Sequence, residues 1–181
     1  MEQVLADRIL HFWFETLGPS EWFASDENID RTISEEFRND WEHCRVLEAG
    51  TFLSNERMAL AAIILFDQFS RNMFRGESLT FSTDRQAREI SGSAIELGLD
   101  NSLTKQEQQF LYMPFMHSEN LDDQEKSLQL FTSLNDAAVY KFAQSHYDVI
   151  EQFGRFPHRN TALGRKTTLE EQKAIEDGAV W

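Results

Sequence analysis

Cations and turn-forming residues gather in one loop of this chain. The stretch Gly154-Arg155-Phe156-Pro157-His158-Arg159-Asn160 is followed by Leu163-Gly164-Arg165-Lys166, and no Asp or Glu occurs between Glu151 and Glu170. Arginine binds carboxylate and phosphate groups through paired hydrogen bonds, and histidine can carry a proton near neutral pH. The composition of this loop therefore predicts a site that holds an anionic ligand.

A second polar group follows the most apolar stretch of the chain. Asp67, Arg71 and Arg75 are spaced by four residues, so they share one face of a helix, and Asn72 lies beside them. One interpretation is a salt bridge that closes a helix, with cations at its C-terminal end. The alternative is a polar cluster at the mouth of a pocket.

The pattern acid-Gln-Phe-small-Arg occurs twice. Asp67-Gln68-Phe69-Ser70-Arg71 and Glu151-Gln152-Phe153-Gly154-Arg155 share it, and each follows a strongly apolar segment. Five matching positions can arise by coincidence, and the flanks do not extend the match. If the pattern is a duplication, it predicts two similar helix ends that face one cleft, as helical-repeat architectures allow.

Histidines supply the third polar group. His117 is followed by Ser118 and Glu119, and His158 lies in the cationic loop. Because histidine can act as an acid or a base near neutral pH, the predicted catalytic residues are His158, His117 and Glu119. His146 lies on an apolar helical stripe, where it is either a ligand-binding residue or a hydrogen-bonded histidine of the core.

The predicted ligand-binding residues combine the loop with the earlier polar group. They are Asp67, Arg71, Asn72, Arg75, His146, Arg155, Arg159, Asn160 and Arg165. The structural alternative is that Arg155 and Arg159 pair with Asp67, Glu119 or Glu151 and lock the loop, since networks of arginine and carboxylate also occur for packing alone.

Motifs for metals, nucleotides and hydrolysis are absent. His117 and Glu119 are two residues apart, but there is no His-Glu-x-x-His and no pair of cysteines, so no metal is predicted. Walker-type and dinucleotide-binding glycine patterns are also missing, and Ser118 lacks the Gly-x-Ser-x-Gly elbow. The sequence leaves the cofactor unknown.

Composition limits the classes of partner. The 181 residues carry a formal net charge of −14, which opposes binding to nucleic acids and to anionic membranes. The longest apolar run, Met58–Phe66, is far shorter than the ~20 residues that span a bilayer, and the N-terminus has no cationic leader. One cysteine, Cys44, suits a reducing compartment. We therefore expect a cytoplasmic protein with no nucleic-acid or membrane partner.

Apolar residues at helical spacing predict the elements that position these groups. The helices are expected over about residues 3–17, 26–49, 55–73, 82–98, 104–114, 121–134, 139–153 and 168–178. Thr104–Glu107 and Thr168–Glu171 match the capping box, and Gly154 suits the left-handed residue that ends a helix. Pro114 is expected to end or kink its helix. Ala179-Val180-Trp181 is expected as a tail.

No stretch alternates as a strand does, so the predicted fold class is all-α. We expect a single domain over residues 1–181, an antiparallel array of about seven or eight helices with short connections. Leu121 is expected on the inward face of its helix, and Phe142 on the apolar stripe that also contains His146.

Several sequence blocks resemble a known bacterial family. They are Phe12-Trp13-Phe14, Asp67–Gly76, Tyr112–Glu119, and Phe153–Asn160 with Leu163-Gly164-Arg165. In order, and over nearly the whole chain, these blocks look like the family catalogued as domain of unknown function 924. The resemblance implies an all-helical fold similar to tetratricopeptide-repeat arrays. It implies no activity, since the family is functionally uncharacterised.

Three functional hypotheses follow. The leading one is that the protein binds a small anionic ligand, bearing phosphate or carboxylate, in a cationic cleft between helix ends. The second is a small-molecule enzyme that uses His158 or His117 as acid or base. The third is a helical-repeat module that binds a peptide or protein partner in a groove.

Overall fold

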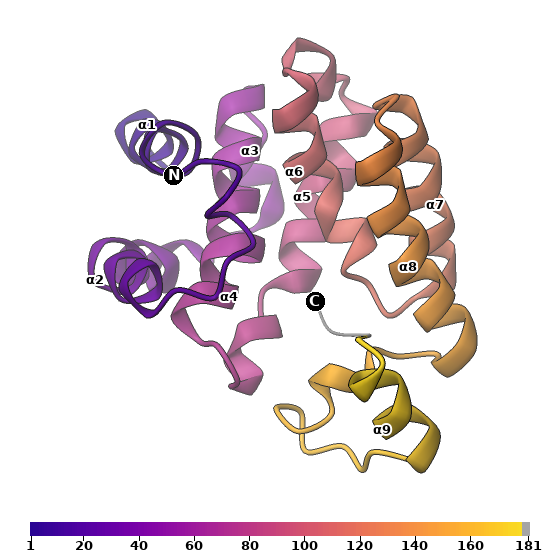
Figure 1. Cartoon of the computed structure of the whole chain (residues 1–181). Coiled ribbons are helices and arrows are strands. Elements are labelled where there is room, and N and C mark those ends of the chain that lie inside the picture. The colour runs from indigo at the N-terminus through magenta and orange to yellow at the C-terminus, as the bar shows by residue number, and fades with distance from the viewer. Residues whose placement is uncertain (179–181) are drawn as a thin grey trace. The chain divides into compact units, whose positions relative to one another are not determined.

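The fold is all-α, as the sequence predicts. The computed structural model describes residues 1–178, which form helices and turns and no strand. None of the helices in these residues is both long enough and apolar enough to cross a membrane. In chain order the α-helices are α1 (Gln3–His11), α2 (Glu27–Cys44), α3 (Glu56–Ile63), α4 (Ser70–Met73), α5 (Asp84–Glu96), α6 (Lys105–Met116), α7 (Leu121–Ser133), α8 (Ala137–Phe153) and α9 (Leu169–Glu176) (Figure 1).

Two π-helical stretches extend these helices. Phe12–Thr16 continues α1, and Ile64–Phe69 joins α3 to α4 without a break, so residues 56–73 form one helical segment. Counted as one, this segment leaves eight helices among the described residues, within the predicted seven or eight. The π stretches were not predicted. They matter because π turns are frequent at functional sites.

The chain divides into two compact units. Unit 1 comprises Met1–Arg75 and Leu79–Pro114, and unit 2 comprises Gly76–Ser78 and the residues from Phe115 onwards. The single domain over residues 1–181 stays a prediction, as does the likeness to tetratricopeptide-repeat arrays. The expected tail at Ala179–Trp181 lies outside the described residues.

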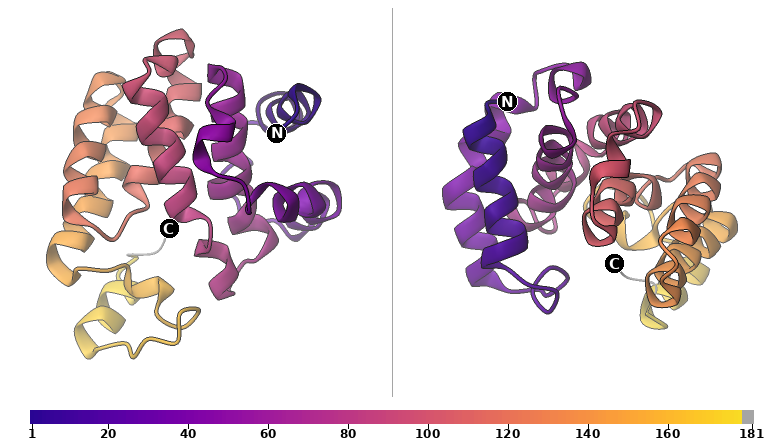
Figure 2. Two further views of the ribbon diagram at one scale, coloured as in Figure 1. Left: turned by 180° about the vertical axis from the view of Figure 1, so that it is seen from behind. Right: turned by 90° about the horizontal axis from the view of Figure 1, so that it is seen from above.

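Unit 1 is built around the segment from α3 to α4. Its residues from Ala59 to Phe66 are completely buried, which accounts for their nearly uniform apolar character. Helices α1 and α5 pack against α3, α2 packs against α4, and Figure 2 shows α1 and α2 side by side. The rings of Phe12 and Trp13 meet Phe69 edge-on, with ring centroids 5.9 and 5.7 Å apart.

Unit 2 contains an antiparallel pair of helices, α7 and α8, that lie side by side (Figures 1 and 2). Asp136 caps α8 by accepting hydrogen bonds from the amides of Ala138 and Val139. The helix ends at Gly154, whose φ of 67° is left-handed, as predicted. The cationic loop therefore starts from a well-defined helix end.

Two predicted helix ends are wrong. Helix α6 continues through Pro114 to Met116, because the burial of Phe115 and Met116 offsets the hydrogen bond that the proline cannot donate. A kink at Pro114, the other outcome expected there, stays a prediction. The helix expected to reach residue 49 ends at Cys44, and Ala49–Phe52 forms a separate 3₁₀ turn.

Two apolar residues face outward, contrary to prediction. Leu121 is 40% exposed and Phe142 is 60% exposed. The side of α7 that is buried includes polar residues instead, since Gln124 and Ser127 are fully buried there beside Phe131. An inward face that carries polar groups cannot be located by apolar periodicity alone.

Candidate functional site

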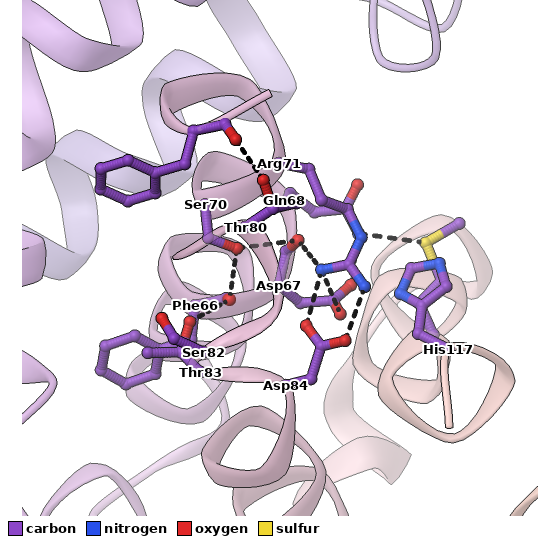
Figure 3. A network of polar contacts seen from close by, with 12 residues as sticks. Phe66, Asp67, Gln68, Ser70, Arg71, Thr80, Ser82, Thr83, Asp84 and His117 are labelled. Carbon is purple, nitrogen blue, oxygen red and sulfur yellow. Dashed lines mark hydrogen bonds and ion pairs between the residues drawn. The ribbon is translucent and has the colours of Figure 1, made fainter. Parts of the chain in front are cut away.

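Asp67 and Arg71 form the centre of a polar network in unit 1 (Figure 3). Asp67 lies in the π stretch and is fully buried; Gln68 donates from Nε2 to its Oδ2 at 2.6 Å, and Arg71 Nη1 lies 3.1 Å from its Oδ1. Arg71 also donates to both carboxylate oxygens of Asp84, at 2.9 and 3.1 Å. Burial alone would lower the pKa of Arg71, but the two carboxylates raise it, so the guanidinium stays charged.

Two hydroxyl groups satisfy a carbonyl within the same network. Ser70 and Thr83 each donate from their side chains to the carbonyl of Phe66, both at 2.7 Å (Figure 3). Because a π stretch shifts the hydrogen-bond register of a helix, its carbonyls gain from such additional donors. Thr83 thereby helps to hold the backbone beside Asp67.

The remaining members of this group bind an acid of α2. Arg75 donates to both oxygens of Asp30, from Nε at 2.7 Å and from Nη2 at 2.9 Å, and Asn72 donates to the same carboxylate at 2.7 Å. These contacts match the structural interpretation, in which the cations close a helix. A role of Asp67, Asn72 or Arg75 in ligand binding stays a prediction.

In unit 2, side chains from several elements hold the turn that follows α6. Gln124 of α7 donates to the carbonyls of Met116 and Ser118, both at 2.7 Å. Arg159 donates from Nη2 to the carbonyl of His117 at 3.0 Å. The backbone at His117 is therefore held by Arg159 at its own carbonyl and by Gln124 at the carbonyls of the two residues that flank it.

Glu119, the next residue, is bound by the cationic loop. Arg165 donates from Nη1 to Oε2 at 2.7 Å and from Nη2 to Oε1 at 3.0 Å, and the amide of Phe156 donates to Oε1 at 2.8 Å. Burial would raise the pKa of Glu119, but these hydrogen bonds and the charges of Arg165 and Arg159 lower it. The carboxylate is thus held in its charged form as an acceptor.

Arg155 has a different partner from those predicted. It donates to both oxygens of Glu171, from Nε at 2.6 Å and from Nη2 at 3.0 Å, and Glu171 also closes the capping box with Thr168. The hydrogen bond from Arg155 is the main reason that the pKa of Glu171 is lowered to about 2. Asn160, which is fully buried, donates to Glu171 at 3.3 Å. The carboxylate of Glu171 therefore accepts hydrogen bonds from two residues of the cationic loop, Arg155 and Asn160.

Two histidines of unit 2 lie beside the ring of Phe156, and a third lies beside one of them. The ring centroids of His146 and of His158 each lie 5.6 Å from that of Phe156, and His117 lies 6.0 Å from His146. The guanidinium of Arg159, which is 6% exposed, lies over the Phe156 ring at 4.5 Å. We call these four residues, His117, His146, His158 and Arg159, the Phe156 cluster.

His146 is neutral within this cluster. It is 3% exposed, and its Nδ1 donates to the carbonyl of Phe142 at 2.8 Å. Its pKa is lowered to about 3, mainly by burial and then by the positive charge of His117, Arg159 and His158. The hydrogen-bonded core histidine foreseen as one alternative fits these contacts.

The structure thus brings two of the three predicted polar groups together within unit 2. Of the residues predicted there, Arg155, Asn160 and Arg165 contact carboxylates, and the Phe156 cluster contains the predicted histidines and Arg159. The group of Asp67, Arg71, Asn72 and Arg75 lies in unit 1. All catalytic and ligand-binding roles stay predictions, as does the idea that Asp67–Gly76 and Gly154–Arg165 face one cleft.

Several residues that organise these networks were not predicted from the sequence. They are Asp30, Asp84, Gln124, Phe156 and Glu171. Two of them had a visible signal, since Asp84 begins a helix and Glu171 stands at the third position of a capping box next to the cationic window. Asp30 had none, because its partners Asn72 and Arg75 are distant in sequence. Gln124 and Phe156 had none either, because neither a polar residue on an inward face nor a phenylalanine in a loop indicates its contacts.

No group of three or more His, Cys, Asp or Glu residues within positions 1–178 could hold a metal ion. Two surface depressions, of about 570 and 600 Å³, lie at the end of α2 with the start of α5 and beside the start of α9. Neither is lined by a residue of the predicted site.

Comparison with known proteins agrees with this fold. A family model described as bacterial protein of unknown function, DUF924, matches residues 9–179. The solved structure of the protein of unknown function ATU0120 from Agrobacterium tumefaciens is similar, with a TM-score of 0.91 and 36% sequence identity over 97% of this chain and 98% of that chain. A search among curated proteins gave no match. The chain thus belongs to the bacterial DUF924 family, whose function is unknown.

Proposed function

We propose that unit 2 binds a small anion, bearing a phosphate or a carboxylate group, at the Phe156 cluster. The observation that carries this proposal is the position of these side chains. The rings of His117 and His146 are 6.0 Å apart, and the ring of His158 and the guanidinium of Arg159 lie 5.6 and 4.5 Å from the ring of Phe156, which His146 also contacts. Three side chains that are cationic when protonated therefore converge on one buried imidazole in a chain whose net charge is −14.

Burial makes this concentration of positive charge significant. Like charges repel more strongly where water is excluded, because the effective dielectric constant is lower there. An anion placed among His117, His158 and Arg159 would offset that repulsion and accept their N–H groups. Arginine suits this role because its planar guanidinium can donate two parallel hydrogen bonds to phosphate or carboxylate.

The other arginines of the loop are less suited to the same role. Arg155 and Arg165 each donate two hydrogen bonds to one carboxylate, Glu171 and Glu119 respectively. These arginines therefore support the loop. We assign Arg159 to the ligand because its guanidinium lies over the ring of Phe156, within the cluster.

Two of the broader expectations accompany this proposal. We infer a cytoplasmic location because the one cysteine, Cys44, is buried and reduced. We also retain the tetratricopeptide-repeat-like architecture, which the antiparallel pair of α7 and α8 supports.

Isothermal titration calorimetry with inorganic phosphate and with citrate tests the proposed binding. At least one anion should bind the wild-type protein in the micromolar to millimolar range, and Arg159→Gln should weaken that binding at least about tenfold. Lys166→Gln is the matched control, since it removes an exposed cation from the same loop. Equal losses in the two variants would mean that only the overall charge matters, and binding that is unchanged in Arg159→Gln would overturn the proposal.

A further inference from the structure

The backbone carbonyls at the end of α6 and just beyond it cannot all be satisfied by hydrogen bonds within the helix. The last four carbonyls of any α-helix lack a partner within the helix. Here the chain turns at Phe115–Ser118, with a hydrogen bond of 3.2 Å from the amide of Ser118 to the carbonyl of Phe115. The carbonyls of Met116, His117 and Ser118 then accept hydrogen bonds from side chains.

Gln124 supplies two of these donors from α7. Its Nε2 lies 2.7 Å from the carbonyls of both Met116 and Ser118, the two residues that flank His117. The side chain is fully buried, and its Oε1 has no hydrogen-bond partner among the described residues. The orientation of the amide is settled by this geometry, because the opposite flip would direct Oε1 at two carbonyl oxygens.

We propose that Gln124 is a positioning residue of the anion site, which fixes the backbone around His117 so that its imidazole faces the ligand. Two carbonyls two residues apart are bound to one rigid amide, so the residue between them has little freedom. Arg159 binds the carbonyl of that middle residue, and in doing so it orients its own guanidinium. Gln124 and Arg159 thus act together on His117, one through the flanking carbonyls and the other directly.

This inference rests on the proposed function and adds a residue to it. The simpler alternative is that Gln124 only caps the end of α6 and stabilises unit 2. The two roles differ in what they predict for binding. A cap affects the stability of the fold and leaves the affinity of the folded protein unchanged, whereas a positioning residue changes the affinity even where the protein is fully folded.

The variant Gln124→Met removes both donors and keeps the length and volume of the side chain. We expect its affinity for inorganic phosphate, measured by calorimetry well below its melting temperature, to fall at least about tenfold, because a small misplacement of a binding group has a large effect. Ser127→Ala is the matched control, since Ser127 lies on the same buried side of α7 and bonds none of these carbonyls. Its affinity should stay within about twofold of the wild type.

A measurement on the wild-type protein covers the case in which Gln124→Met does not fold. In a ¹H–¹⁵N NMR spectrum, the side-chain amide of Gln124 should exchange slowly with solvent, because both of its hydrogens are bonded and buried. Its signals should shift on titration with phosphate and give the same dissociation constant as the signals of His117.

The outcomes separate this inference from the proposed function. If the wild type binds phosphate and Gln124→Met binds it equally well, or if the Gln124 amide signals do not respond to phosphate, Gln124 is a structural cap and the inference is wrong while the proposed function stands. If neither phosphate nor citrate binds the wild type, the proposed function fails and the inference falls with it. A selective loss of affinity in Gln124→Met, with Ser127→Ala unchanged, supports both.

Discussion

Arg165 and Glu119 join the loop after α8 to the turn after α6 across 46 positions of the sequence. The two hydrogen bonds between them, at 2.7 and 3.0 Å, use the parallel geometry that makes arginine and carboxylate a strong pair. Arg165 also donates to the carbonyl of Phe156 at 3.1 Å, and the amide of Phe156 donates to Glu119. The backbone of Phe156 is therefore held from both sides, and the ring at the centre of the cluster is fixed in place.

Removal of the charge on Glu119 should therefore destabilise the protein. Glu119→Gln keeps the shape of the side chain but leaves Arg165 with a weaker acceptor, and we expect a loss of about 1–3 kcal/mol in the free energy of unfolding. Urea unfolding followed by circular dichroism measures this loss. The control Glu125→Gln, at an exposed position of α7, should change stability by less than about 0.5 kcal/mol. Similar values for the two variants would show that the pair contributes little.

Protonation of His146 should oppose folding in mild acid. The unfolded chain binds a proton at the ordinary histidine pKa of about 6.5, whereas the folded protein binds it only near the lowered pKa of about 3. Between these values the unfolded state holds more protons, so stability falls as the pH falls, by at most about 1.4 kcal/mol per pH unit. The stabilising contribution is complete above about pH 6.5 and is lost progressively towards pH 3.

The variant His146→Asn tests this pH dependence. Its amide can still donate to the carbonyl of Phe142, but it cannot titrate. Unfolding free energies of both proteins, measured between pH 7.5 and 4.5, should show a wild-type advantage that shrinks steadily with acidification. An advantage that stays constant over that range would contradict the assignment of His146 as a buried neutral histidine.

The ion pair of Arg155 with Glu171 predicts a second, more acidic transition. Because the pKa of Glu171 is lowered from its ordinary value to about 2, the pair stabilises the fold above about pH 4.5 and its contribution is lost as the pH falls towards 2. Arg155→Gln should raise the pKa of Glu171, which ¹³C NMR titration of the carboxyl group detects. Arg85→Gln, which removes an exposed partner of Glu89, should leave that titration unchanged.

Gly154 should resist substitution for conformational reasons. Its φ of 67° is left-handed, which costs a residue with a side chain about 1–2 kcal/mol, although nothing lies within 4 Å of an added Cβ. Gly154→Ala should lower the unfolding free energy by about that amount, and Gly154→Asn by less. Gly50 offers the control, since it also has open space around it and no positive φ. A comparable loss in Gly50→Ala would point to flexibility rather than to strain.

The parts of the fold that follow local rules were predictable from sequence. The capping box at Thr168, the helix start at Asp26 and the left-handed end at Gly154 each depend on a few neighbouring residues, and all three are present. The continuous helical segment over residues 56–73 was also expected, but its π stretch was not. That stretch is stabilised in part by Thr83, which lies beyond the helix in sequence.

Many of the residues in the polar networks could be predicted from the sequence, but which acid pairs with which arginine could not. The cationic loop indicated that carboxylates or a ligand must lie nearby, yet the acid that binds Arg155 is Glu171 rather than Asp67, Glu119 or Glu151. The pairing of Arg155 with Glu171 depends on how the cationic loop folds back on α9. The spacing of apolar residues in the sequence does not show that path. Gln124 was missed for a related reason: a polar residue on an inward face breaks the apolar pattern from which burial is inferred.

The most direct test of anion binding is a crystal structure of the protein soaked in tungstate, which has the shape and charge of phosphate and scatters anomalously. If an anion binds at the Phe156 cluster, an anomalous peak should lie within hydrogen-bond distance of Arg159 and of His117 or His158, and no such peak should appear in crystals of Arg159→Gln. Peaks that occur only beside exposed cations such as Lys166, with none at the Phe156 cluster, would contradict anion binding at this cluster.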